Sequence, residues 1–213
     1  STPGNAFAAD IAGYNESYIT LGDAECLLGL GFNISNIGTK ISIDDGENHY
    51  FLPTNLRLGG SLTYPLDDYN TLAFNVDINK LLVPTPPIKE DGQTDEEHLQ
   101  KVRDYREGSS IAGIFKSFGD APGGVSEELK EITWSVGMEY TYNDQFSVRG
   151  GYFNEDKMKG NRKYFSFGAG LRLSAFQLDA SYLVSTESSN PFDQTLRFSI
   201  GFDLDGLRGL FGR

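Results

Sequence analysis

Strict alternation of large apolar residues with small or polar ones constrains this chain more than any other feature of its sequence. From Ile132 to Tyr142, every second residue is large and apolar, and Thr, Ser, Gly and Glu occupy the positions between. Successive side chains of a β-strand point to opposite faces of the sheet, so this period of two gathers the apolar residues on one face. The sequence therefore predicts strands with one apolar face and one small or polar face.

The same alternation recurs in nine stretches of the chain. They span residues 7–12, 28–35, 56–64, 72–79, 132–142, 146–152, 165–173, 176–185 and 196–204. Short connections such as residues 65–70 and the corner at 174–175 take turns with longer ones at 37–55, 81–131, 155–162 and 186–193. This regular exchange of short and long connections favours an antiparallel up-and-down sheet, as in outer-membrane barrels.

The environment of the apolar face is not decided by hydropathy. No run of 18 apolar residues exists and the mean hydropathy is −0.36, which excludes a transmembrane helix. A transmembrane barrel would have the same low value because its lumen is polar. The second face is mostly Gly, Ser, Thr and Asn, and we interpret its isolated charges as a lumen network of cross-strand pairs: Glu139, Arg149, Arg172, Asp179, Arg197 and Asp203. A soluble barrel or sandwich with these charges in water remains the alternative.

Composition excludes several classes of function. The net charge of −12 and the absence of a basic stripe argue against a nucleic-acid partner. The single cysteine, Cys26, rules out an internal disulfide framework, and we expect it to be a small apolar wall residue.

Candidate metal and catalytic groups do not form a recognisable site. The acidic stretch Asp44–Glu47 lacks the spacing of a calcium loop and has ordinary turn chemistry, and His49 and His98 lack zinc-ligand spacing. No nucleophile elbow or phosphate-binding loop is present. We therefore expect a protein that is not an enzyme and that needs no metal or cofactor.

Four long phrases of the chain are distinctive, and they read "YFLPTNLRLGGSLTYPLDDYNTLAFNVDINKLLVPTPP", "SIAGIFKSFGDAPGGVSEELKEITWSVGMEYTYNDQFSVRGGYF", "GNRKYFSFGAGLRL" and "NPFDQTLRFSIGFDLDG". These phrases closely resemble the PorV family, also called LptO, of the Bacteroidota type IX secretion system. The resemblance implies an all-β, FadL-like transmembrane barrel of fourteen strands in the bacterial outer membrane. Residues 1–213 would form one barrel domain that supplies the C-terminal nine strands, with extracellular long loops and a periplasmic C-terminus. Strands missing from the chain would leave open edges, so we expect residues 1–213 alone not to form a stable barrel.

The resemblance also implies a function and partners. PorV-like proteins bind secreted cargo through its C-terminal signal domain, associate with the SprA (Sov) translocon and pass cargo to the surface attachment complex that contains PorU. Outer-membrane lipid would surround the barrel. The alternative is a FadL-like channel for hydrophobic solutes, but the small, polar and charged inward face favours the transport adaptor.

The connection 81–131 is the longest, and we expect it to be an extracellular, partly helical loop. Thr94 followed by Glu97 predicts a helix start with a capping box. Further on, four apolar residues at helical spacing would either pack against the barrel mouth or one another, or form a docking surface. Together with the loop that precedes residue 56, they give our candidate partner-binding residues: Tyr50, Phe51, Leu52, Pro53, Leu82, Pro84, Ile111, Ile114, Phe115 and Phe118.

Overall fold

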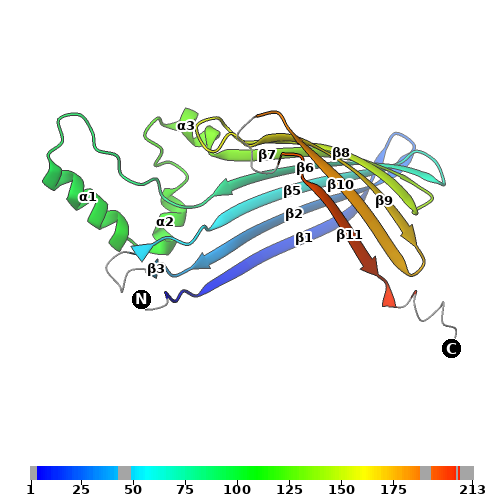
Figure 1. The fold of residues 1–213 in the computed structure, drawn as a ribbon, viewed down its shortest axis with the longest axis horizontal. Helices are drawn as coiled ribbons and strands as arrows, with labels where there is room; N and C mark the ends of the chain where they lie inside the picture. Colours follow the sequence, from blue (N-terminus) through cyan, green and yellow to red (C-terminus); the bar gives the residue numbers. More distant parts are fainter. Residues whose placement is uncertain (1–3, 43–48, 188–192, 205, 207–213) are drawn as a thin grey trace. The chain divides into compact units, whose positions relative to one another are not determined.

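A computed structural model describes residues 4–42, 49–187, 193–204 and 206, and it is mostly β (Figure 1). Nine strands form one sheet whose spatial order follows the sequence, which confirms the expected nine-stranded antiparallel up-and-down arrangement. The strands are β1 (Ala8–Leu21), β2 (Ala24–Gly38), β5 (Asn55–Pro65), β6 (Asn70–Leu81), β7 (Ile132–Tyr142), β8 (Phe146–Asn154), β9 (Lys163–Leu173), β10 (Phe176–Ser185) and β11 (Leu196–Phe202).

Strand bounds agree closely with the alternation in the C-terminal half and less well at the start. β7 and β10 have the predicted bounds, whereas β1 continues to Leu21, nine residues beyond the predicted end at residue 12. The prediction failed because Tyr14 and Tyr18 interrupt the apolar period. Tyr14 lies over Gly29, where an added Cβ would come 2.6 Å from the Tyr14 hydroxyl oxygen. A large side chain is accommodated there because the neighbouring strand carries a glycine.

Two strands lie at the ends of the sheet order. β1 and β11 each have one neighbour, so the sheet formed by the described residues has two edges and is not a closed barrel. No helix in the described part of the chain is long and apolar enough to cross a membrane.

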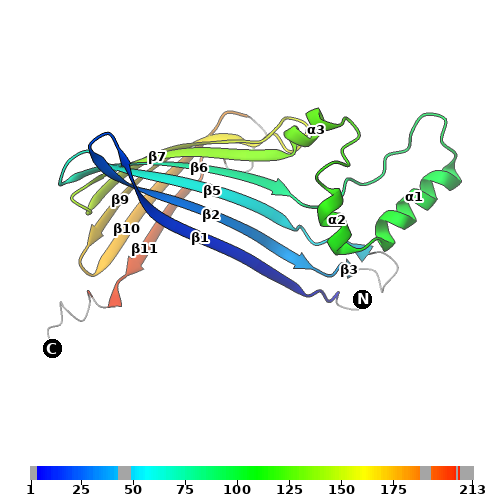
Figure 2. The same cartoon turned by 180° about the vertical axis from the view of Figure 1, so that it is seen from behind.

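The chain divides into two compact units, which we describe separately. The first comprises Ser1–Gly13, Phe32–Arg57 and Asn79–Ile132. It contains the connection after β6, with α1 (Asp95–Glu107), α2 (Ser110–Lys116) and α3 (Val125–Lys130). The expected loop 37–55 carries a short ladder of β3 (Ile41–Ser42) and β4 (His49–Tyr50), and its acidic residues Asp44, Asp45 and Glu47 lie outside the described residues. α1, α2 and the ladder lie at the end of β6 from which the connection departs (Figure 2).

The start of α1 follows the prediction. The Thr94 hydroxyl oxygen accepts a hydrogen bond from the Glu97 amide at 3.3 Å, and the Glu97 carboxylate accepts one from the Thr94 amide at 3.0 Å. This reciprocal pair is the expected capping box, and it satisfies two amides that the helix itself leaves without partners.

The second unit comprises Tyr14–Gly31, Leu58–Ile78 and Thr133–Arg213. In its β7–β11 region the apolar residues share one face and remain exposed, among them Val136, Val148, Phe167 and Ile200. Little apolar volume is fully buried, and Cys26 has no exposed surface. No described layer of protein therefore covers the apolar face of these strands.

Candidate partner-binding loop and polar face

Phe51 joins the loop before β5 to α1. Its ring makes an edge contact with Tyr105 at a centroid distance of 5.2 Å, and the Lys40 ammonium lies 3.9 Å from the Phe51 centroid. Lys40 also donates to the Tyr105 carbonyl oxygen at 3.1 Å, near the C-terminus of α1, where a positive charge is favourable. Burial lowers the pKa of this ammonium. The cluster fixes the last turn of α1 beside residues 50–53.

α2 packs through a face made of small residues. Its N-cap Ser109 accepts from the Ala112 amide, and Gly113 and Ser117 are buried. A Cβ on Gly113 would come 2.9 Å from both the Phe51 ring and Pro84, so only glycine allows this approach. The Ser117 hydroxyl donates to the Ile114 carbonyl oxygen at 2.7 Å, which satisfies a buried polar group.

The apolar residues of α2 point mainly to the surface. Ile111, Phe115 and Phe118 are exposed, Phe115 by 74%, whereas Ile114 is half-buried. Phe118 lies just past the C-cap of α2, so the expected helical spacing holds only as far as Phe115. Ile114 is thus the only one of these four side chains that is partly withdrawn from solvent.

The other candidate residues differ in exposure. Tyr50 and Pro53 are exposed, Leu52 is half-buried, and Leu82 and Pro84 are buried. The Leu82 amide donates to the Thr54 carbonyl oxygen at 2.7 Å, which continues the β5–β6 pairing into the loop. Leu82 and Pro84 thus support the loop from within, and neither offers an exposed surface to a partner.

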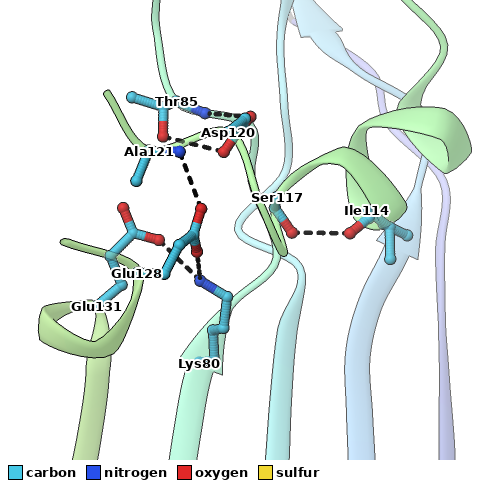
Figure 3. Close-up of polar contacts among 8 residues, drawn as sticks. All are labelled: Lys80, Thr85, Ile114, Ser117, Asp120, Ala121, Glu128 and Glu131. Atoms are coloured by element: carbon cyan, nitrogen blue, oxygen red, sulfur yellow. Dashed lines mark hydrogen bonds and ion pairs between the residues drawn. The ribbon is translucent and has the colours of Figure 1, made fainter. Parts of the chain in front are cut away.

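A buried lysine, not singled out from the sequence, anchors α3 to the end of β6. Lys80 is 8% exposed, and its ammonium contacts the carboxylates of Glu128 at 2.9 Å and Glu131 at 2.8 Å (Figure 3). Glu128 also accepts from the Ala121 amide at 2.9 Å. Burial raises the pKa of Glu128, but the hydrogen bonds from Lys80 and Ala121 outweigh it, and the net shift is downward. The cluster therefore holds α3 and the segment before it on the strand.

A second polar contact closes the same segment. Both the amide and the hydroxyl of Thr85 donate to the Asp120 carboxylate, at 3.0 and 3.2 Å (Figure 3). Thr85 follows β6 and Asp120 precedes α3, so this contact joins the two ends of the segment 85–120, which contains α1 and α2. The signal in the sequence was weak because the partners are 35 residues apart.

On the polar face of the second unit, three of the six predicted lumen charges meet. Arg149 pairs with Glu139, directly opposite in the β7–β8 register, and its guanidinium donates to Asp179 at 2.7 Å. A Cβ on Gly170 would lie 2.7 Å from the Asp179 carboxylate, so this glycine makes room for the pair. Arg172 joins indirectly, by donating to Gln177.

The two remaining predicted lumen charges lie outside this cluster. Arg197 stands opposite Ser181 in the β10–β11 register, and the Asp203 carboxylate accepts from the Gly206 amide at 3.1 Å.

A polar recess of about 200 Å³ lies beside the ion-paired Glu139, Arg149 and Asp179, and these three side chains form part of its lining. Within the described ranges, no group of three or more His, Cys, Asp or Glu side chains is arranged to hold a metal ion.

The β8–β9 connection contains an ion pair between the buried Glu155 and the exposed Arg162. Both carboxylate oxygens of Glu155 accept from the Arg162 guanidinium, at 2.7 and 2.6 Å, and the carboxylate also accepts from the Arg162 amide. These hydrogen bonds lower the pKa of Glu155 although burial opposes the shift. The Arg162 guanidinium lies over Phe153, which stacks on Tyr164 at 5.0 Å.

No curated protein matches the chain. A family model does match, over residues 1–88, and it is described as type IX secretion system protein PorV. This range covers β1 to β6 and the start of the long connection, and the match confirms the resemblance drawn from the sequence. Residues 1–88 of the chain are therefore similar to the PorV family of type IX secretion system proteins.

Proposed function

We propose that the chain is part of a FadL-like outer-membrane barrel of fourteen strands that serves the type IX secretion system as a transport adaptor. The observation that carries this proposal is the apolar face, which stays exposed from β5 to β11. A bilayer would cover this face, and closure of the sheet by further strands would satisfy its two edges. The family match over residues 1–88 supplies the link to type IX secretion.

The adaptor would bind the C-terminal signal domain of secreted cargo and pass it from the SprA (Sov) translocon to the PorU-containing attachment complex. Its long connections would be extracellular and its C-terminus periplasmic. We place partner binding on the exposed part of the candidate surface, namely Tyr50, Ile111, Phe115 and Phe118. Phe51 and Pro84 would hold that part in position through their close approach to Gly113 of α2. Leu82 would do so through its backbone hydrogen bond to Thr54.

The test is truncation of Phe115 and Phe118 to Ala in the full-length protein. Removal of an exposed aromatic anchor at an interface can weaken binding by about 2 kcal/mol or more while folding is preserved. We expect normal membrane assembly, reduced translocon co-purification and reduced cargo secretion. Ile88→Ala, an exposed apolar position elsewhere in the same connection, is the matched control. Unchanged secretion in both aromatic variants would refute the docking surface, and loss of assembly would make the residues structural.

A channel for hydrophobic solutes is the second candidate. The stacked rings of Phe153 and Tyr164, which face the polar side of β8 and β9, favour it. The ion-paired Glu139, Arg149 and Asp179 on the same face oppose it, because an apolar solute cannot solvate charges. Binding of a radiolabelled fatty acid that is lost in Phe153→Ala would support the channel over the adaptor.

A further inference from the structure

α3 has the reverse of the usual polarity of a surface helix. Its carboxylate side, with Glu128 and the following Glu131, is turned inward onto Lys80, and both side chains are less than one-fifth exposed. Val125 and Leu129, one helical turn apart, are 77% and 63% exposed. A helix in water normally buries its apolar residues and exposes its charged ones. An inward polar side and an outward apolar side are expected where the surroundings are less polar than the protein.

The alternation of side chains along β6 shows on which face of this strand α3 is anchored. The side-chain amide of Asn55 donates to the side-chain oxygen of Asn79 at 2.6 Å across the β5–β6 pair. Lys80 is the next residue of the strand, so its side chain leaves on the opposite face. That face carries Phe74, Val76 and Ile78 at alternate positions of the same strand, all of them exposed. Lys80 thus continues the column of apolar residues along β6.

A lysine at the end of an apolar strand face needs neutralisation wherever that face meets hydrocarbon. Glu128 and Glu131 supply it, and the Ala121 amide holds Glu128 in place. These contacts also orient α3, because Glu128 binds inward while Val125 and Leu129 stay on the outer side of the helix. The charge and the exposed apolar pair are therefore parts of one arrangement.

We infer that α3 is a membrane-contacting segment whose Val125 and Leu129 enter the outer leaflet at the boundary between acyl chains and headgroups. This inference rests on the proposed outer-membrane location. The occupant is lipid because the carboxylates that anchor α3 bind Lys80, whose side chain leaves β6 on the face that we propose to meet the bilayer. Lys80, Glu128 and Glu131 form the ion-paired polar support that fixes the depth of the helix.

Tryptophan quenching by lipids brominated on their acyl chains tests this inference in the full-length protein, reconstituted in vesicles. The native Trp134, on the apolar face of β7, reports on the proposed membrane location. Leu129→Trp and, independently, Val125→Trp are made in a background in which Trp134 and every other tryptophan of the full-length protein are replaced by Phe, and they report on α3. Leu99→Trp, at an exposed apolar position of α1, is the matched control.

We expect brominated lipids to quench Trp134 and both α3 tryptophans to a similar extent, and to leave the tryptophan at position 99 unaffected. Quenching of Trp134 without quenching at positions 125 and 129 would overturn the inference, and would mark α3 as a protein-docking surface if translocon addition then changed its emission. Absence of quenching at Trp134 itself would instead overturn the outer-membrane location. The two failures are therefore distinguishable.

Discussion

Gly113 lies so close to Phe51 that a Cβ on the glycine would come 2.9 Å from the aromatic ring. Pro84, near the start of the long connection that also contains Gly113, approaches the same point at 2.9 Å. Three chain segments that are distant in sequence thus meet at a residue without a side chain. Only the absence of a Cβ lets α2 lie this near to both rings.

Gly113→Ala should therefore loosen α2. Both neighbouring atoms belong to rings with little freedom to move, so overpacking should cost about 1–3 kcal/mol. Limited proteolysis of the reconstituted protein should show faster cleavage in residues 109–120, with membrane assembly unchanged. Gly119→Ala is the control, because nothing lies within 4 Å of its added Cβ. Equal protease resistance of the two variants would disprove the close packing.

Gly170 performs a similar role for the ion pairs of the polar face. In Gly170→Ala the new methyl group would crowd the Ser147 hydroxyl and the Asp179 carboxylate, and we expect the displaced ion pair with Arg149 to cost about 1–3 kcal/mol in the free energy of unfolding. Urea unfolding of the refolded full-length protein measures this loss. Gly150→Ala, with open space around the added Cβ on the neighbouring strand, should be nearly neutral. A similar loss in both variants would mean that the effect comes from glycine flexibility alone.

The Glu155–Arg162 pair should make the β8–β9 connection sensitive to acid. Hydrogen bonds from Arg162 lower the pKa of Glu155 in the folded protein, so the pair stabilises the fold above the ordinary carboxyl pKa of about 4.3. That contribution is lost as the pH falls through the lowered folded pKa. Hydrogen exchange of residues 156–163, corrected for intrinsic pH dependence, should show constant protection from pH 7 to about 5 and a decline below the ordinary pKa.

Glu155→Gln separates this effect from general acid unfolding. The variant should have reduced protection already at pH 7 and little further change on acidification, because the titrating group is gone. Asp68→Asn, in the exposed β5–β6 turn, should behave like the unmodified protein. Acid loss of protection that persists unchanged in Glu155→Gln would assign it to another group.

Features with a local cause were predictable from the sequence. The start of α1 depends on two residues three positions apart, and Thr94 and Glu97 form the expected capping box. The strands depend on a period of two, and β7 and β10 have the predicted bounds. The cross-strand pair Glu139–Arg149 follows from parity and a tight turn, which bring the two residues into register.

Features with a distant cause were not predictable. Lys80 and Glu128 are 48 residues apart, and nothing near Lys80 in the sequence marks it as buried. α3 has six residues and its N-cap is Gly124, which has no side chain to cap the helix, so the usual start signal is missing. The sequence predicts that Leu82 and Pro84 lie on the candidate partner-binding surface. Both are buried, because α2 and the end of β5 lie against them. Each of these depends on tertiary contacts within the long connection.

The two faces of β7 should respond differently to a charge. Val136 lies on the exposed apolar face opposite Tyr152, whereas its neighbour Ser135 lies on the other face opposite Phe153. If lipid covers the apolar face, Val136→Arg should destabilise the assembled barrel by about 2–4 kcal/mol near the middle of the bilayer. Ser135→Arg should cost less, because the polar face already accommodates Arg149. Ile200→Arg in β11 should repeat the Val136→Arg result. Urea unfolding in lipid vesicles and the yield of assembled protein measure both effects, and equal losses at Val136 and Ser135 would contradict a membrane on the apolar side.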